Sequence, residues 1–355
     1  MKFHIGGEPF YSPALLIKKR QFRLESYSSS RFNDKFVCYT GGGVHSLYLI
    51  LKNLNLHKTD FCLLPSYLCP TILYPFKKLG INFRFYKVNS KLEIDLDYLK
   101  NAVDGNCKSI LFINYFGFGH SSETLNVLNE FKQRKIIIIE DASQSFFSHF
   151  DEIIGDYYFN SFRKFLPLDG SLIVSDDEIK LQSFNTSKGY MLYKTSGQLF
   201  RYLNYKTAID FSDIFKNLFR KAEHNYYINF PVSFHRFNKH LLEKYNLEKL
   251  IVMRREYAQL LINNFADFSF IKELPDNVTP LGYPIICRDR IVLKKHLIKE
   301  KIFCPVHWDL SGEISGEDFN ESIELSGKIL TLPLNENINP DHFYRYISLV
   351  KKFIS

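Results

Sequence analysis

The stretch Ile136–Gln144, with the sequence IIIIEDASQ, decides the fold of this chain. Four consecutive isoleucines predict a strand that is buried on both faces, as in a parallel sheet covered by helices. Two acids, Glu140 and Asp141, follow at the carboxyl end of this strand. Because α/β proteins place their ligand sites at that end of the strands, the stretch predicts both an α/β fold and the position of a site.

Segments on both sides of this strand alternate between two patterns. Short apolar runs predict strands, and apolar residues at helical spacing predict the helices between them. The expected strands are 36–40, 61–65, 82–88, 109–114, the isoleucine run and 171–175, and the expected helices are 46–54, 70–79, 95–103 and 122–134. Such alternation is typical of a mainly parallel sheet sandwiched by helices.

The pattern changes after about residue 178. Long helical segments dominate to about residue 265, and a second, smaller α/β region follows. Its expected elements are a strand at 282–287 and helices at 290–301 and 340–353. We therefore expect a large domain over residues 1–224, including the N-terminal segment, and a small C-terminal α/β domain over residues 225–355.

Composition and charge exclude some classes of protein. The net charge is +8, but lysine and arginine are spread along the chain, so no arm typical of nucleic-acid binding is expected. The charge indicates either an ordinary solvated surface or attraction of an anionic substrate or a charged membrane surface. No apolar stretch is long enough for a signal peptide or a membrane span. The six scattered cysteines predict reduced thiols in a cytoplasmic protein, and their spacing with histidine predicts no metal site.

Lys164 follows the acidic strand end within the segment Ser161-Phe162-Arg163-Lys164. An acid at a strand end and a lysine soon after are what pyridoxal 5'-phosphate (PLP) chemistry requires. The acid keeps the pyridine nitrogen protonated, and the lysine carries the aldehyde as a Schiff base. The plainer alternatives are a helix cap for Asp141, a surface acid for Glu140 and a surface loop for Lys164.

Other segments allow a functional and a structural interpretation. The loop Gly41–Gly43 joins a strand to a helix, where backbone N–H groups suit a phosphate, although three glycines also suit a tight turn. His307 and Trp308 either line a pocket or form a buried structural pair. Cys69 has no nearby base in the sequence, so a buried thiol is expected rather than thiol chemistry.

Taken in order, these segments resemble the DegT/DnrJ/EryC1/StrS family of PLP-dependent, fold-type-I aminotransferases, most of which act on nucleotide-linked keto sugars. The resemblance runs from Ile5 almost to the C-terminus. The most specific match is Glu140–Gln144, which resembles the Glu-Asp-Ala-x-Gln motif of the family. The glycine loop and the segments 64–67, 114–117, 155–162 and 225–229 resemble further family motifs.

The resemblance implies a role for each matching residue. Asp141 would pair with the pyridine nitrogen, Gln144 would contact the ring hydroxyl, and Lys164 would carry the aldehyde and move protons. Three positions, Ser161 with the loop at Gly43 and Val44, would hold the phosphate. Asn225 would complete the site of a neighbouring subunit, which implies a homodimer with shared active sites. We assign the remaining candidates to ring stacking (Tyr67) and to substrate binding (Tyr115, His307 and Trp308).

Three positions depart from the family pattern. Lys164 lies three residues after Ser161 rather than five. Cys69 stands where an aromatic residue usually stacks on the cofactor, so stacking passes to Tyr67 or is lost. Val44 or His45 replaces the usual threonine of the phosphate loop, so backbone donors have to contribute more.

The resemblance implies transfer of an amino group, with glutamate as the donor, to a nucleotide-linked keto sugar. The product would serve the synthesis of cell-surface polysaccharide or glycoconjugate. One alternative is PLP-dependent sugar dehydration, but the relatives that catalyse it usually replace the lysine by histidine, and residues 155–170 contain no histidine. Another is a degenerate member that binds a sugar nucleotide or a partner without catalysis.

Overall fold

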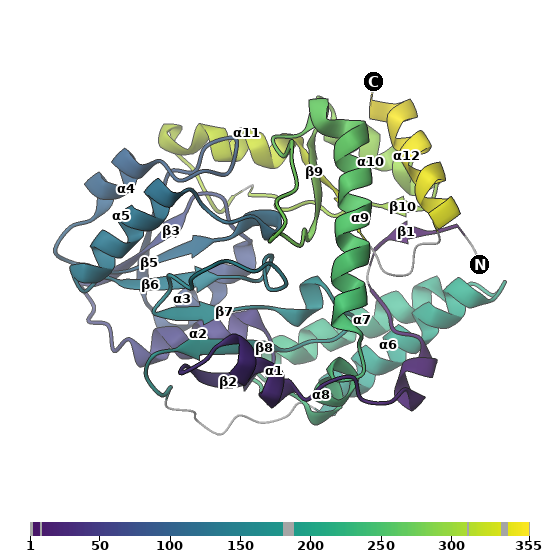
Figure 1. Ribbon diagram of the computed structural model, residues 1–355, viewed down its shortest axis with the longest axis horizontal. Coiled ribbons are helices and arrows are strands. Elements are labelled where there is room, and N and C mark those ends of the chain that lie inside the picture. The colour runs from purple at the N-terminus through teal and green to yellow at the C-terminus, as the bar shows by residue number, and fades with distance from the viewer. Residues whose placement is uncertain (1–2, 8, 180–187, 311, 335–339, 355) are drawn as a thin grey trace.

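The fold is built around one seven-stranded sheet, seen at the left of Figure 1. The computed structural model describes residues 3–7, 9–179, 188–310, 312–334 and 340–354. Within them the strand order is β2-β8-β7-β6-β5-β3-β4, with β4, β3, β5, β6 and β7 parallel and β8 antiparallel to both of its neighbours. The strands are β2 (Phe36–Thr40), β3 (Phe61–Pro65), β4 (Asn82–Tyr86), β5 (Cys107–Ile113), β6 (Ile137–Asp141), β7 (Tyr157–Phe159) and β8 (Ser171–Ser175).

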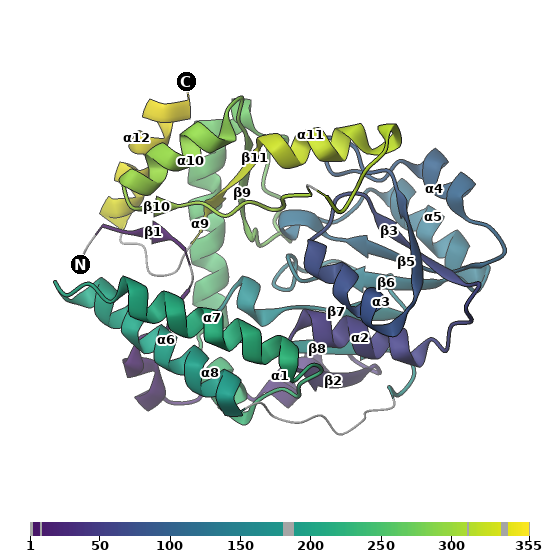
Figure 2. The same ribbon diagram turned by 180° about the vertical axis from the view of Figure 1, so that it is seen from behind.

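Helices lie on both faces of this sheet. α5 (Ser122–Gln133) lies in front of it in Figure 1, whereas α2 (Gly43–Asn53) and α3 (Leu73–Leu79) lie in front in the reverse view of Figure 2. Side-chain caps start two of the helices: Ser121 accepts from the Thr124 N–H before α5, and Asp95 accepts from the Tyr98 N–H before α4 (Leu96–Ala102). Because β3 and the centre of β6 are buried throughout, the apolar core lies between the sheet and these helices.

The second half of the chain is helical and then mixed. Two long helices, α6 (Lys188–Lys206) and α7 (Ser212–Ile228), pack side by side, followed by α8 (Arg236–Leu242) and α9 (Leu247–Phe265). A two-stranded antiparallel sheet joins β9 (Gly282–Ile286) to β11 (Ile329–Pro333). The N-terminal β1 (Ile5–Gly6) pairs with β10 (Ile302–Phe303). The remaining helices are α1 (Leu24–Arg31), α10 (Arg290–Lys299), α11 (Asn320–Lys328) and α12 (Pro340–Ile354).

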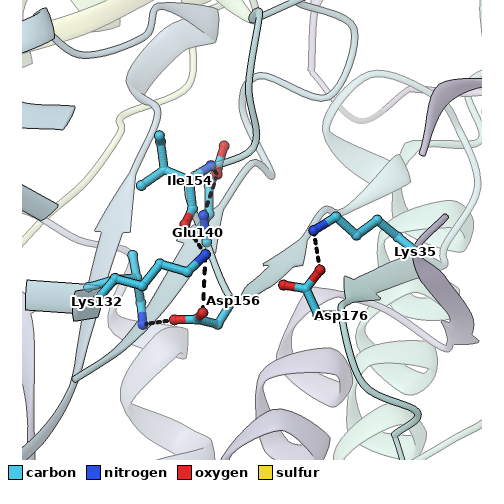
Figure 3. Close-up of polar contacts among 8 residues, drawn as sticks. Lys35, Lys132, Glu140, Ile154, Asp156 and Asp176 are labelled. Atoms are coloured by element: carbon cyan, nitrogen blue, oxygen red, sulfur yellow. Dashed lines mark hydrogen bonds and ion pairs between the residues drawn. The ribbon is translucent and has the colours of Figure 1, made fainter. Parts of the chain in front are cut away.

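The buried acid Glu140 connects strand β6 to the loop before β7 through hydrogen bonds. Glu140 accepts hydrogen bonds from the Asn114 amide (2.8 Å) and from the N–H groups of Ile154 and Gly155 (3.2 Å each). Lys132 bridges to the same loop through the Ile154 carbonyl, as Figure 3 shows together with the separate Lys35–Asp176 ion pair. The interpretation of Glu140 as a surface acid is therefore wrong, because only 3% of this residue is exposed.

The predicted α/β architecture is confirmed, with a mainly parallel sheet and helices on both faces. The expected strands and helices are present with ends shifted by a few residues, apart from the helical segment at 180–187, which lies outside the described residues. Helix α2 begins at Gly43, three residues before the expected start at Ser46. The division into domains at residue 225 stays a prediction, and Asn225 itself lies inside α7.

Candidate functional site

The site begins where β6 ends. Asp141 is the last residue of this strand, between β5 and β7, and its carboxylate accepts the Ser143 N–H at 2.8 Å. Burial raises the pKa of Asp141, and the positive charge of Lys164 acts in the opposite direction. The strand therefore holds a buried carboxylate beside the lysine that the sequence singled out.

Lys164 ends a short 3-10 helix, Phe162–Lys164, that follows β7. Its Nζ atom lies 5.8 Å from the centre of the Trp308 ring, over its face. Burial, together with the positive charge of Lys164, lowers the pKa of His307 to about 3, so this histidine is neutral. The alternative of a lysine on a surface loop is wrong, because Lys164 belongs to a 3-10 helix, is half-buried and lines a cavity.

Aromatic side chains form one wall around Lys164. The Tyr67 hydroxyl donates to the His307 carbonyl and accepts the Trp308 N–H at 3.0 Å. Tyr115 in turn donates to the Tyr67 carbonyl, and its ring lies 6.4 Å from that of Trp308. The His307 ring is fixed by Thr331, whose Oγ1 lies 2.9 Å from Nδ1. These predicted residues come together from both halves of the chain.

The glycine loop lies on the other side of the strand end. A Cβ atom built at Gly43 would lie 3.1 Å from the Asn160 carbonyl and 3.4 Å from Cβ of Ser161, so the loop and the serine are in contact. The first intrahelical bonds of α2 are donated by His45 and Ser46 to the Gly42 carbonyl. The N–H groups of Gly43 and Val44 therefore precede the helical bonding pattern at the positive end of α2, which suits an anion.

Two buried donors at the site have no acceptor among the described residues. Gln144 accepts the Phe116 N–H at 2.6 Å through Oε1, which leaves its Nε2 without a partner. His45, in the first turn of α2, likewise has an Nε2 atom without a partner. PLP carries a phosphate, a ring oxygen and a ring nitrogen. The donors at Gln144 and α2, with the Asp141 carboxylate, match these groups, so the residues present fit PLP.

A cavity of about 1450 Å³ opens over Lys164 and His307. It lies between the N-terminal segment, the α6–α7 pair and the region around β10 and α10. Among the residues that the structure describes, nine lysine and arginine side chains line it against two carboxylates, Asp210 and Glu223. The cations are Arg163, Lys164, Lys194, Arg201, Lys216, Arg220, Arg254, Lys294 and Lys301. Such a cavity favours an anionic substrate.

One predicted residue lies apart from this group. Asn225 is on α7, and its side-chain amide donates to the Lys221 carbonyl at 3.0 Å. Its neighbour Tyr226 instead lies against the glycine loop, with its hydroxyl over Gly42. Tyr226 and His45 were not predicted as site residues, although Tyr226 lies in the motif-like segment 225–229 and His45 lies at the threonine position of the phosphate loop.

Within the described residues, no group of histidine, cysteine and acidic side chains has the arrangement of a metal site. None of the helices in the described ranges is long and apolar enough to span a membrane. All six cysteines are unpaired thiols, and Cys69 is half-buried rather than buried, with its sulfur 3.0 Å from Thr71 Oγ1.

Solved structures share this architecture. A DegT/DnrJ/EryC1/StrS aminotransferase from Brucella abortus is 18% identical, with a TM-score of 0.67 over 98% of this chain and 92% of that chain. The sugar aminotransferase CalS13 from Micromonospora echinospora is 15% identical, with a TM-score of 0.65 over 98% and 93%. NtdA from Bacillus subtilis, with the cofactor PMP bound, is 17% identical, with a TM-score of 0.64 over 98% and 78%. The chain thus has the fold of the fold-type-I PLP aminotransferases.

The family model of the DegT/DnrJ/EryC1/StrS aminotransferase family matches residues 19–187, a range that includes Asp141 and Lys164. This match confirms the family resemblance that the motifs predicted. Two curated relatives carry the name GDP-4-keto-6-deoxy-D-mannose 3-dehydratase. The one from Escherichia coli O55:H7 is 24% identical over 78% of this chain and 73% of its own length. The one from Yersinia pseudotuberculosis is 26% identical over 46% and 43%.

Proposed function

We propose that this protein is a PLP-dependent aminotransferase that transfers an amino group from glutamate to a nucleotide-linked keto sugar. The observation that carries the proposal is that Lys164, which lines a cationic cavity together with His307, lies within electrostatic reach of the buried carboxylate of Asp141. We further propose that it acts in the cytoplasm as a homodimer and supplies an amino sugar for surface polysaccharide or glycoconjugate.

Each residue would perform one task at the cofactor. Bound at this site, PLP supplies an aldehyde for the amine and a ring that delocalises electrons. Asp141, buried at the end of β6, would hold a proton on the pyridine nitrogen. Gln144 would donate its Nε2 hydrogen to the ring oxygen. Lys164 Nζ would take a proton from the α-carbon of the amino donor and deliver it to C4′, the aldehyde carbon of the cofactor.

The cavity supports an anionic acceptor. Its lysine and arginine side chains begin beside Lys164 and continue along α6, α7 and α10. A diphosphate placed along them would be attracted while the sugar carbonyl lies near Lys164 Nζ. The neutral His307 and the Trp308 ring would bound the space for the sugar.

Sugar dehydration is the second candidate, favoured by the names of both curated relatives. The lysine at position 164 argues against it, because the relatives that dehydrate sugars usually carry a histidine in place of this lysine. The products separate the two reactions. Amination replaces the ketone oxygen by an amino group, whereas dehydration removes a ring hydroxyl and leaves the ketone.

Absorbance spectra of the purified protein test the proposal. With PLP added, we expect a visible band that glutamate converts to the band of pyridoxamine phosphate, with release of 2-oxoglutarate. Mass spectrometry of a nucleotide-linked keto sugar incubated with enzyme, PLP and glutamate then identifies the product. Absence of both cofactor bands would contradict the proposal and favour a binding protein without catalysis. A deoxygenated ketone as product would favour the dehydratase.

A further inference from the structure

Helix α7 brings a tyrosine to the start of α2 within the same chain. A Cβ atom built at Gly42 would lie 2.2 Å from Oη of Tyr226 and 3.8 Å from Cδ2 of His45. The hydroxyl and the imidazole edge that carries Nε2 therefore converge beside the glycine that precedes α2. This is the helix end at which Gly43 and Val44 present their N–H groups.

His45 is a hydrogen-bond donor at this point. The Val232 N–H donates to its Nδ1 at 3.1 Å, so Nδ1 carries a lone pair. Burial and the charge of Arg163 lower the pKa of the ring to about 3, so the ring is neutral and its proton is on Nε2. That N–H is buried and has no acceptor within the described part of the chain. A buried donor without an acceptor indicates a ligand atom that accepts from it.

The surrounding side chains hold both donors in place. The His45 ring stacks on Phe230 at 4.5 Å and meets the Tyr226 ring edge-on at 4.4 Å. Tyr226 packs against Tyr190 at 5.2 Å. The guanidinium of Arg163 lies 5.9 Å from the centre of the Tyr226 ring. A positive charge therefore lies close to the donors of His45 and Tyr226. This combination suits an anion with several oxygens, such as a phosphate.

We propose that His45 and Tyr226, from the chain that carries Lys164, donate hydrogen bonds to the phosphate of the cofactor and so complete its cradle within one subunit. The inference rests on the proposed use of PLP. It replaces the role that Asn225 of a neighbouring subunit was expected to play. It also explains how a loop with Val44 in place of a hydroxyl residue can hold a phosphate.

The single tryptophan gives a direct readout of cofactor binding. Trp308 lies beside Lys164, so its fluorescence reports occupancy without any turnover. We would titrate the wild type and Tyr226→Phe with PLP and with pyridoxal, which lacks the phosphate. Loss of one hydrogen bond to a charged group predicts PLP binding weakened about 10-fold, with pyridoxal binding unchanged. Tyr227→Phe is the matched control, because its ring packs on Tyr74 and Tyr226 but is not among the atoms nearest to the Cβ built at Gly42, so both affinities should stay at the wild-type value.

Each other outcome overturns this inference or the proposed function. Unchanged PLP binding by Tyr226→Phe, or equal weakening of PLP and pyridoxal, would contradict a phosphate contact. If Asn225→Ala is the only variant that weakens the binding of PLP but not of pyridoxal, the phosphate contact would come from Asn225 of a neighbouring subunit, as the resemblance implies. A wild type that binds neither compound would overturn the proposed function itself, which is a different result.

A hybrid of two variants tests whether the contact lies within one chain. Lys164→Ala and Tyr226→Phe chains with different tags are co-expressed and purified over both tags. If Tyr226 acts within its own chain, the only Lys164 of the hybrid sits beside Phe at position 226 and binds PLP weakly. Tight binding would place Tyr226 in the neighbouring site and overturn the inference. If the two chains form no hybrid, the titration of Tyr226→Phe against Asn225→Ala remains the test of which residue contacts the phosphate.

Discussion

Burial and the charge of Lys164 shift the pKa of the Asp141 carboxyl in opposite directions. Burial raises the pKa of this carboxyl, whereas the Lys164 ammonium favours the charged form. A bound pyridinium would add a second positive partner and hold the carboxylate ionised. In the proposed reaction the residue would therefore act through its charge and not only through its hydrogen bonds.

Asp141→Asn is expected to retain PLP but to slow the glutamate half-reaction by about 100-fold or more, because an amide cannot hold the ring nitrogen protonated. Stopped-flow absorbance after mixing with glutamate measures this rate. Ser145→Ala, a change at a nearby buried hydroxyl, is the control and should leave the rate close to that of the wild type. A half-reaction of wild-type speed in Asp141→Asn would remove Asp141 from its proposed role.

Glu140 links stability to pH. Burial raises its pKa from 4.5 to about 7, despite three donated hydrogen bonds. The folded state therefore favours the protonated form. Its contribution to stability is complete below about pH 4.5 and is lost as the pH rises through about 7, by roughly 3 kcal/mol at most.

Glu140→Gln should remove this dependence, because Asn114 can turn its amide over to accept from the new side chain. Urea unfolding at a series of pH values should show the wild type losing stability relative to Glu140→Gln between about pH 5 and pH 8. Glu93→Gln, at an exposed position, is the control. Parallel curves for the wild type and Glu140→Gln would show that Glu140 ionises normally.

At the scale of elements, the contact between α2 and α7 depends on a glycine. A methyl group at position 42 would overlap the Tyr226 hydroxyl at 2.2 Å but lie 3.4 Å from Cζ of the same ring, which is an ordinary contact. Gly42→Ala should therefore lower the free energy of unfolding by about 1–3 kcal/mol, and Tyr226→Phe in the same chain should recover most of this loss.

Chemical denaturation of the two single variants and the double variant measures this coupling. Gly105→Ala is the control, because no atom lies within 4 Å of its built Cβ. Additive losses in the double variant would mean that α7 does not lie against the loop in solution.

Elements with a strong local pattern could be predicted from the sequence. The isoleucine run of β6 and the apolar spacing of α2 are local signals, and both elements form as expected. The strand β7 has only three residues, and β1 has two and pairs with β10 near the other end of the chain. β1 forms only through a partner far along the chain, and β7 is too short to show a pattern of its own and is held between β6 and β8, so no local pattern could reveal either strand.

At the scale of the whole molecule, the candidate site was only partly predictable. Asp141, Gln144 and Lys164 lie within one stretch of chain, so their order and spacing indicated a common site. His45 and Tyr226 lie in segments that resemble family motifs, but their contact depends on packing between α2 and α7, which the sequence does not reveal. The cationic cavity also escaped prediction, because its lysines and arginines come from segments scattered along the chain.

This cavity predicts how binding depends on salt. Inhibition by UDP or GDP should weaken as ionic strength rises, because the lining cations attract the diphosphate. Lys216→Gln and Lys294→Gln should each raise the inhibition constant about 2–5-fold at low salt and less at high salt. Lys100→Gln, on the exposed side of α4, is the control. Inhibition independent of salt would contradict an anionic subsite in this cavity.

The most direct test of the central claim is to identify the lysine that binds PLP. The protein is incubated with PLP, reduced with borohydride, digested and mapped by mass spectrometry. We predict one modified residue, Lys164, and no modification when glutamate is added before the reduction. The account would be contradicted if only surface lysines were modified, if glutamate did not change this modification, and if Lys164→Ala showed the same modification.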